Sequence, residues 1–187
     1  MPRLEKRRSL QHLTVCALFA ALISVLSPIA VPIGPIPVSL GLLGVLITAA
    51  TLSPVGSLTA VAVFMALGLC GLPVFSGGGS GAMIFVGPTG GYLWSYLLVA
   101  PLVSLFCRLV RRARSNVAAI FWTSLACLAG VVICYICGTV QYIFLMQTSL
   151  LSALAVCVLP FLPFDIAKSI LAAYLATKLK NILGTRV

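Results

Sequence analysis

Residues 38–71, VSLGLLGVLITAATLSPVGSLTAVAVFMALGLCG, contain no charged side chain. They lie inside a longer run, residues 12–107, in which 96 consecutive positions lack Lys, Arg, Asp and Glu. A helix that crosses the bilayer core needs about 20 mostly apolar residues, so this run is long enough for about four spans joined by short loops.

The composition of the whole chain agrees with this interpretation. Hydrophobic residues make up 61% of the 187 positions and charged residues 7%, and the mean hydropathy is +1.21. Soluble domains carry about 25% charged residues. The composition therefore argues against a soluble enzyme or a nucleic-acid-binding module, despite the net charge of +10, and indicates an integral membrane protein.

Proline and glycine divide the apolar sequence into segments. Residues 149–159 are apolar but too short to cross, and they predict an interfacial or re-entrant helix between the fifth and sixth spans. The basic start followed by an apolar stretch also fits a signal peptide, but the remaining sequence is itself apolar enough to span.

We expect a single all-α membrane domain over residues 1–187, with Gly- and Pro-rich outer loops and six transmembrane helices near 12–31, 38–52, 55–71, 83–107, 117–146 and 163–178.

The basic residues predict the orientation. Eleven of the twelve lie in the N-terminal segment 1–11, the loop 108–116 and the segment from 178 onward, including the tail 179–187. With six spans all three segments fall on one side of the membrane, whereas five spans would separate them. Because cytoplasmic loops carry an excess of Lys and Arg, both termini are expected in the cytoplasm and the protein in the cytoplasmic (inner) membrane.

One charged pair lies within a predicted span. Asp165 and Lys168 are spaced i, i+3, which places them on one helix face, and Ser169, Ala172 and Ala176 continue that face. Pro163 fits a first helical turn, so Asp165 lies near the positive end of the helix dipole. Ionisable groups inside a membrane are costly and are therefore candidates for function. A structural ion pair is the alternative.

A glycine-rich stretch, called the glycine loop below, covers residues 71–81, and further glycines follow in Gly87-Pro-Thr-Gly-Gly-Tyr92. Glycine permits φ > 0 and close approach of the backbone to a ligand, so the stretch is either a ligand-binding loop or a flexible outer loop. A nucleotide-binding P-loop would need Gly-Lys-Ser/Thr, and no Lys occurs here. Any ATP that drives this protein is thus expected to be hydrolysed by a partner.

The remaining reactive residues do not predict a catalytic or metal site. Cys134 and Cys137 have redox spacing, but they lie in an apolar helix, where thiols behave as small hydrophobes. His12 is the only histidine. An enzyme would need an acid–base or nucleophilic constellation, which the few embedded titratable groups do not supply. We therefore expect no catalytic residues, no metal and no cofactor bound by this chain.

Small residues mark a surface on the first span. Ala17 and Ala21 are separated by three residues and flanked by Ala20 and Ser24. Small residues at this spacing let helices approach closely. The surface serves either packing inside the protein or docking of a partner.

The sequence resembles the BioY family, the biotin-binding S components of energy-coupling factor (ECF) transporters. The resemblance is carried by Gly71-Leu-Pro-Val-Phe75, the glycine loop, Gly87-Pro-Thr-Gly-Gly-Tyr92-Leu93 and the ending Val158-Leu-Pro-Phe-Leu-Pro-Phe-Asp165-Ile-Ala-Lys168. The proline-rich Pro32-Ile-Gly-Pro35-Ile-Pro37 resembles the first outer loop of the family. The likeness extends from about residue 12 to residue 180.

The resemblance implies a six-helix S component that captures biotin and takes it up through the cytoplasmic membrane. It also implies docking, through Ala17 and Ala21, onto a transmembrane coupling subunit with two ABC-type ATPases, which use the ATP. The candidate residues for contact with biotin are Asp165, Lys168, Phe75, Gly77, Gly78, Gly79, Thr89, Gly90, Gly91, Tyr92, Gln141 and Tyr142.

Three parts of the sequence depart from the family pattern. Gly41 and Leu42 stand where relatives often carry Gln-Thr, Ser76-Gly-Gly-Gly-Ser-Gly81 lacks an Asn that some relatives have, and Phe164 replaces a Gly. Asp165 and Lys168 are kept. Two alternatives stay open: a solitary biotin transporter without the coupling module, and an S component for another vitamin.

Overall fold

The computed structural model describes the backbone of residues 2–32, 36–110 and 115–183, and the side chains of residues 10–32, 36–110 and 115–180. Within these ranges the chain forms eight α-helices, one short 3₁₀-helix (η1) and one two-stranded ribbon. The elements are α1 (Pro2–Leu26), β1 (Ala30–Val31), β2 (Val38–Ser39), α2 (Gly41–Thr51), α3 (Pro54–Leu69), η1 (Ser76–Gly78), α4 (Met83–Val86), α5 (Gly90–Leu109), α6 (Asn116–Met146), α7 (Leu150–Cys157) and α8 (Leu162–Leu183).

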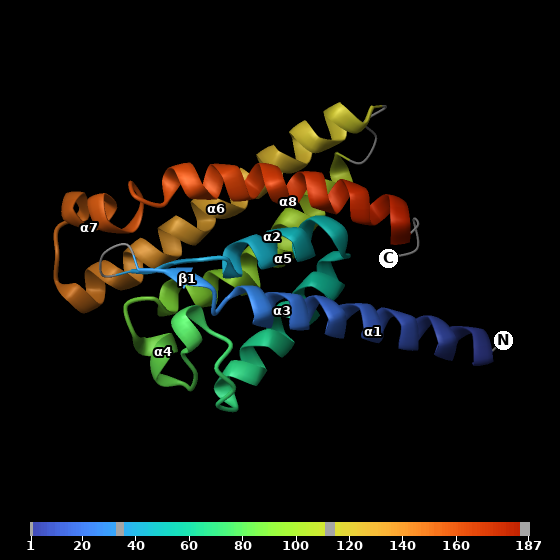
Figure 1. Cartoon of the computed structure of the whole chain (residues 1–187), viewed down its shortest axis with the longest axis horizontal. Helices are drawn as coiled ribbons and strands as arrows, with labels where there is room; N and C mark the ends of the chain where they lie inside the picture. Colours follow the sequence, from blue (N-terminus) through green and yellow to red (C-terminus); the bar gives the residue numbers. More distant parts are fainter. Residues whose placement is uncertain (1, 33–35, 111–114, 184–187) are drawn as a thin grey trace.

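The long helices pack into one bundle. Helix α5 packs against α6, α3 and α2, and α8 packs against α6 and α2. Every residue of the short helix α2 is buried, which places it in the middle of the bundle. In Figure 1 the start of α1 and the end of α8 lie towards one end of the long axis, while α7, β1 and α4 lie towards the other. The basic residues Arg108 and Lys180 belong to the last turns of α5 and α8, and Lys178 lies shortly before the last turn of α8.

Serine side chains cap the N-terminal ends of three helices: Ser53 at α3, Ser115 at α6 and Ser149 at α7. The hydroxyl oxygen of Ser53 accepts from the N–H of Gly56 at 3.0 Å, and Pro54 follows at the first helical position. Ser149 caps α7 in the same way by accepting from Ser152. A capping oxygen satisfies one of the N–H groups that a helix start leaves unpaired, which matters more where water is scarce.

The bounds of the first two predicted spans differ in the structure, where α1 already begins at Pro2. The α1 helix ends at Leu26 instead of continuing to residue 31, and Ala30–Val31 pairs antiparallel with Val38–Ser39. The expected helix start at residue 38 is therefore wrong, and α2 begins at Gly41. The physical reason is the density of proline in this stretch, because proline cannot continue a helix, whereas the ribbon satisfies the exposed backbone groups.

The fourth predicted span is broken. Residues 83–86 form α4, and α5 begins only at Gly90. The backbone of Gly87 is extended (φ −81°, ψ 178°), and Pro88 follows. The prediction for residues 117–146 is confirmed by α6, and the short helix expected at 149–159 is confirmed by α7. Helices α7 and α8 meet at a bend of 51°.

The helices differ in their capacity to cross a bilayer. Among the described residues, α5 and α6 are each long and apolar enough to span, and the bent pair α7 and α8 would make a third, broken span. The apolar part of α1, residues 10–26, and helices α2 and α3 are shorter. Large apolar side chains also stay exposed around the bundle, including Phe121, Val132 and Phe144. Apolar surface of this extent is typical of a protein that faces lipid.

Candidate substrate-binding site

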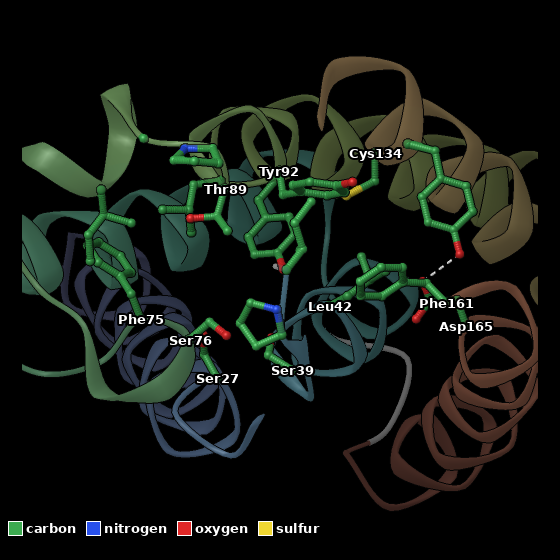
Figure 2. Close-up of a pocket in the computed structure, with 18 of the residues that line it drawn as sticks. Ser27, Ser39, Leu42, Phe75, Ser76, Thr89, Tyr92, Cys134, Phe161 and Asp165 are labelled. Atoms are coloured by element: carbon green, nitrogen blue, oxygen red, sulfur yellow. Dashed lines mark hydrogen bonds between the residues drawn. The ribbon is translucent and has the colours of Figure 1, made fainter. Parts of the chain in front are cut away.

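A cavity of about 390 Å³ lies within the bundle, among residues from the ends of α1 and β2, the loop 75–76, the segment 83–89 and helices α2, α5, α6 and α8. This volume falls within the range of small-molecule sites, about 300–1,000 Å³. Figure 2 shows most of the side chains that line it. Of the twelve expected contact residues, the cavity is lined by Asp165, Lys168, Phe75, Thr89 and Tyr92.

The charged pair forms one wall of the cavity. The Nζ atom of Lys168 lies 2.8 Å from Oδ1 of Asp165, and the two side chains are 9% and 4% exposed. The predicted shared helix face is thereby confirmed, as is the position of Asp165 in the first turn of α8. Ser169, Ala172 and Ala176 are buried on the same face, against α2 and α6. Two buried opposite charges are tolerated because each neutralises the other.

Two further groups hold the pair in place. The Lys168 ammonium also donates to the carbonyl oxygen of Ser39 in β2 at 2.8 Å, and the hydroxyl of Tyr135 in α6 donates to Oδ2 of Asp165 at 2.8 Å. An ammonium has three protons and an ionised carboxylate has about four acceptor positions. One proton of Lys168 and about two acceptor positions of Asp165 therefore remain for a ligand.

Aromatic and apolar side chains form the other walls. Phe75, Leu42 and Phe161 face the cavity, as Tyr92 and Tyr96 do from α5. The Phe75 ring is 1% exposed and packs edge-on against Phe64 and Phe85, with centroid distances of 5.5 and 5.3 Å. Such edge-to-face packing is a favourable aromatic geometry. This surface suits the apolar rings and alkyl chain of a small ligand.

Backbone N–H groups of the glycine loop form hydrogen bonds with carbonyl oxygens of the same loop. The N–H groups of Gly78 and Gly79 donate to the carbonyl oxygens of Phe75 and Ser76, and Gly79 in turn accepts from the N–H of Phe75 at 3.0 Å. Gly77 and Gly78 have φ values of 68° and 79°, which residues other than glycine rarely adopt. These two glycines and Gly79 do not line the cavity. Their position indicates that they shape the loop, and Ser76 is the loop residue next to Phe75 that faces inward.

The other four expected contact residues lie outside the cavity wall. Gly90 and Gly91 are buried where α5 meets α6, and a side chain there would meet the backbone of Phe85 and Cys137. The side-chain amide of Gln141 donates to the carbonyl oxygens of Phe85 and Gly87, at 2.9 and 2.8 Å. Tyr142 is buried in the apolar core. These contacts hold α4 and the start of α5 against α6.

Several residues that line the cavity were not among the predicted ligand contacts. Tyr135 bonds Asp165, which is 30 residues away in the sequence, and Ser39 bonds Lys168, which is 129 residues away. No local sequence pattern links positions so far apart. Ser76, at the edge of the glycine loop, carried a weak signal because it is polar in a loop already singled out. The departures at Gly41 and Leu42 fall beside the site, since Leu42 faces the cavity.

Ala17 and Ala21 do not line the cavity and lie on the outside of α1. Both are exposed, and so are their neighbours Leu18 and Val25, at 66% and 67%. The opposite side of α1 is buried through Cys16, Phe19, Ala20 and Ile23. Ala17 and Ala21 are therefore not packed within the described part of the chain, whereas the flanking Ala20 is.

Comparison with known proteins finds relatives that match most of the chain. The "Biotin transporter BioY" of Thermotoga maritima is 34% identical over 173 residues, which cover 92% of this chain and 98% of the relative. The "Probable biotin transporter BioY" of Bacillus subtilis is 29% identical and covers 94% and 91%. "Biotin transporter BioY2" of Lactococcus lactis is 45% identical, over about half of each chain. These relatives are transporters and not enzymes.

A solved structure has the same fold. The crystal structure at 2.1 Å of the S-component for biotin from an ECF-type ABC transporter superposes with a TM-score of 0.83, at 29% identity, and the match covers 94% of this chain and 93% of that one. Together with the apolar helices, these likenesses identify a multi-pass membrane protein. The model of the BioY family matches residues 2–185, and the chain belongs to that family.

Proposed function

We propose that this protein captures biotin and carries it across the cytoplasmic membrane as the S component of an ECF transporter. The observation that supports this most directly is the buried Asp165–Lys168 pair in the wall of a cavity of about 390 Å³. The family and the relatives named as biotin transporters support the choice of ligand.

The chemistry of the cavity suits biotin. Biotin carries a cyclic urea with two N–H donors and one carbonyl oxygen, an apolar thioether ring and a chain that ends in a carboxylate. The free acceptor positions of Asp165 can take a urea N–H, and the remaining proton of Lys168 can go to the urea oxygen. Hydrogen bonds to charged groups are the stronger kind. The aromatic and apolar walls, including Phe75 and Phe161, suit the rings.

In the proposed topology the six crossings are α1, α2, α3, α5, α6 and α8, with α7 at the outer surface. The spread of basic residues supports cytoplasmic termini, because Arg108 ends α5 and Lys178 lies near the end of α8. The cavity then lies in the outer half of the bundle, under the ribbon and the glycine loop. Ligand would enter from outside.

In the proposed transport step the exposed Ala17 and Ala21 of α1 dock onto a transmembrane coupling subunit that carries two ABC-type ATPases. Small exposed residues permit close helix contact. Uptake measured in cells with and without the coupling module separates this assembly from a solitary transporter, because only a coupled protein loses uptake when the module is removed.

The test of the ligand is equilibrium binding of labelled biotin to the purified protein in detergent, with unlabelled vitamins as competitors. Saturable binding that is displaced by biotin-like compounds alone is the expected result. Absence of binding by a folded sample would contradict the assignment of biotin, and displacement by another vitamin would identify a different substrate.

A further inference from the structure

The glycine loop contributes one hydroxyl to the cavity wall. Ser76 lines the cavity, and its Oγ atom is buried without a hydrogen-bond partner among the described residues. Buried hydroxyls in native proteins are almost always paired. Since this one lies at a cavity wall, its natural partner is a group on the ligand.

The loop holds Ser76 in a defined position. The preceding ring of Phe75 is anchored between Phe64 and Phe85, and the N–H of Phe75 donates to Gly79 across the loop at 3.0 Å. The N–H of Gly81 donates to the carbonyl of Gly68 in α3 at 2.8 Å and fastens the far side. The hydroxyl is therefore positioned before a ligand arrives, which lowers the entropic cost of using it.

Ser76 lies at the end of the cavity away from the charged pair. In Figure 2 Ser76 and Ser27 are drawn on one side and Asp165 on the other, with Tyr92 and Leu42 between them. Thr89 also lines the cavity with a hydroxyl side chain. The cavity thus has a charged pole at Asp165 and Lys168 and, across a middle lined by Leu42, Tyr92 and Ser39, a pole of hydroxyl groups that includes Ser76 and Ser27.

The charges decide which end of a carboxylate-bearing ligand meets each pole. Asp165 and Lys168 neutralise each other, and a second carboxylate beside Asp165 would add an uncompensated buried negative charge. The urea group suits that pole because it is neutral and offers N–H donors. The carboxylate then extends to the hydroxyl pole, where hydroxyl protons can stabilise it.

The geometry points to Ser76 as a second anchor, whose hydroxyl donates a hydrogen bond to the ligand carboxylate at the end of the cavity opposite Asp165. The inference rests on the proposed function, in which that ligand is biotin. It assigns the recognition role of the glycine loop to one side chain instead of its backbone N–H groups.

The test is a cycle of two ligands and two variants. The ligands are biotin and an analogue in which a methyl group replaces the carboxyl group, and the variants are Ser76→Ala and the control Ser80→Ala. Ser80 is exposed in the same loop and does not line the cavity. Ser76→Ala is expected to weaken biotin binding about ten- to hundredfold, the loss typical of a hydrogen bond to a charged group, and to leave binding of the analogue nearly unchanged. Ser80→Ala should change neither.

Equal losses for both ligands would overturn the inference, because Ser76 would then act on the rings or on the loop itself. Unchanged biotin binding would overturn it as well. Ser76→Cys, which keeps a weaker donor of similar size, is expected to fall between the wild type and Ser76→Ala, and thermal unfolding of each variant reports folding separately. Failure of the wild-type protein to bind biotin would instead contradict the proposed function.

Discussion

The hydroxyl of Tyr135 donates to Oδ2 of Asp165 at 2.8 Å, while Lys168 occupies Oδ1 of the same carboxylate at 2.8 Å. The carboxylate of α8 is thus bonded on both oxygens by groups from two helices. The arrangement fixes its orientation before a ligand binds and leaves acceptor positions free on each oxygen. Affinity in such a site depends on the ionised carboxylate and on the groups that orient it, and the two contributions are separable by mutation.

Asp165→Asn tests the ionised carboxylate. The variant keeps the size of the side chain but removes the charge, so biotin binding is expected to weaken at least about tenfold, from the loss of a charged hydrogen bond worth about 1.5–3 kcal/mol. Equilibrium binding of labelled biotin measures the loss. Unchanged affinity in a folded variant would remove Asp165 from the site.

A double variant separates binding from folding at this position. Asp165→Asn alone leaves the buried side chain of Lys168, 9% exposed, without its carboxylate partner, and unpaired buried charges destabilise proteins by about 3–5 kcal/mol. Asp165→Leu combined with Lys168→Met removes both charges and is expected to recover the thermal stability but not the binding. Recovery of binding together with stability would mean that the pair is purely structural.

Tyr135→Phe tests the orienting group. The ring stays in the cavity wall, but the hydroxyl that holds Asp165 is lost, so the carboxylate must be ordered when the ligand binds. Ordering one side chain costs about 0.5–1.5 kcal/mol, which predicts about two- to tenfold weaker biotin binding, a smaller loss than for Asp165→Asn. Tighter binding by the variant would show that Tyr135 competes with the ligand for Oδ2.

The sequence predicts the elements of this site better than their assembly. Residues 116–146 form one helix because the apolar run continues without Pro or charge, and the i, i+3 spacing of Asp165 and Lys168 brings the pair together within one turn. Both features are local. The ribbon that delivers the carbonyl oxygen of Ser39 depends on the pairing of residues 30–31 with 38–39, and no periodicity at either segment predicts which α8 side chain it meets.

The glycine loop shows the same limit. Its composition correctly indicates positive φ values, which Gly71, Gly77, Gly78 and Gly81 adopt. Composition does not show whether the N–H groups point to a ligand or to the carbonyl oxygens of the loop itself, and in the structure those of Gly78 and Gly79 do the latter. The outcome depends on where Phe75 is anchored, which is decided by its packing against Phe64 and Phe85.

Ala21→Trp tests the proposed docking surface on α1. Ala21 is exposed and does not line the cavity, so binding of biotin to the isolated protein is expected to stay normal. A bulky side chain at a close helix contact costs about 1–3 kcal/mol, and uptake that depends on the coupling module should fall accordingly. The matched control is Ile136→Trp on the exposed side of α6, 58% exposed, which should not impair uptake. Normal uptake by Ala21→Trp would mean that this part of α1 is not the docking surface.

Gln141→Glu tests the brace between α6 and the segment that precedes α5. The side-chain amide donates to the carbonyl oxygens of Phe85 and Gly87, whereas an ionised carboxylate of the same shape has no proton to donate and repels both oxygens. Loss of buried hydrogen bonds costs about 1–3 kcal/mol, so the variant is expected to unfold at a lower temperature. Because Gly87 and Thr89 line the cavity, biotin binding should weaken as well.

Gln147→Glu is the matched control for this brace. Gln147 donates to the carbonyl oxygen of Phe144 at 2.8 Å in the same way, but it is exposed at the end of α6, where water can replace the lost hydrogen bond. Its thermal unfolding and biotin binding are expected to stay close to those of the wild type. Equal effects of the two substitutions would show that a glutamate at this end of α6 destabilises the protein through its charge alone, and the brace would then have no special part in shaping the cavity.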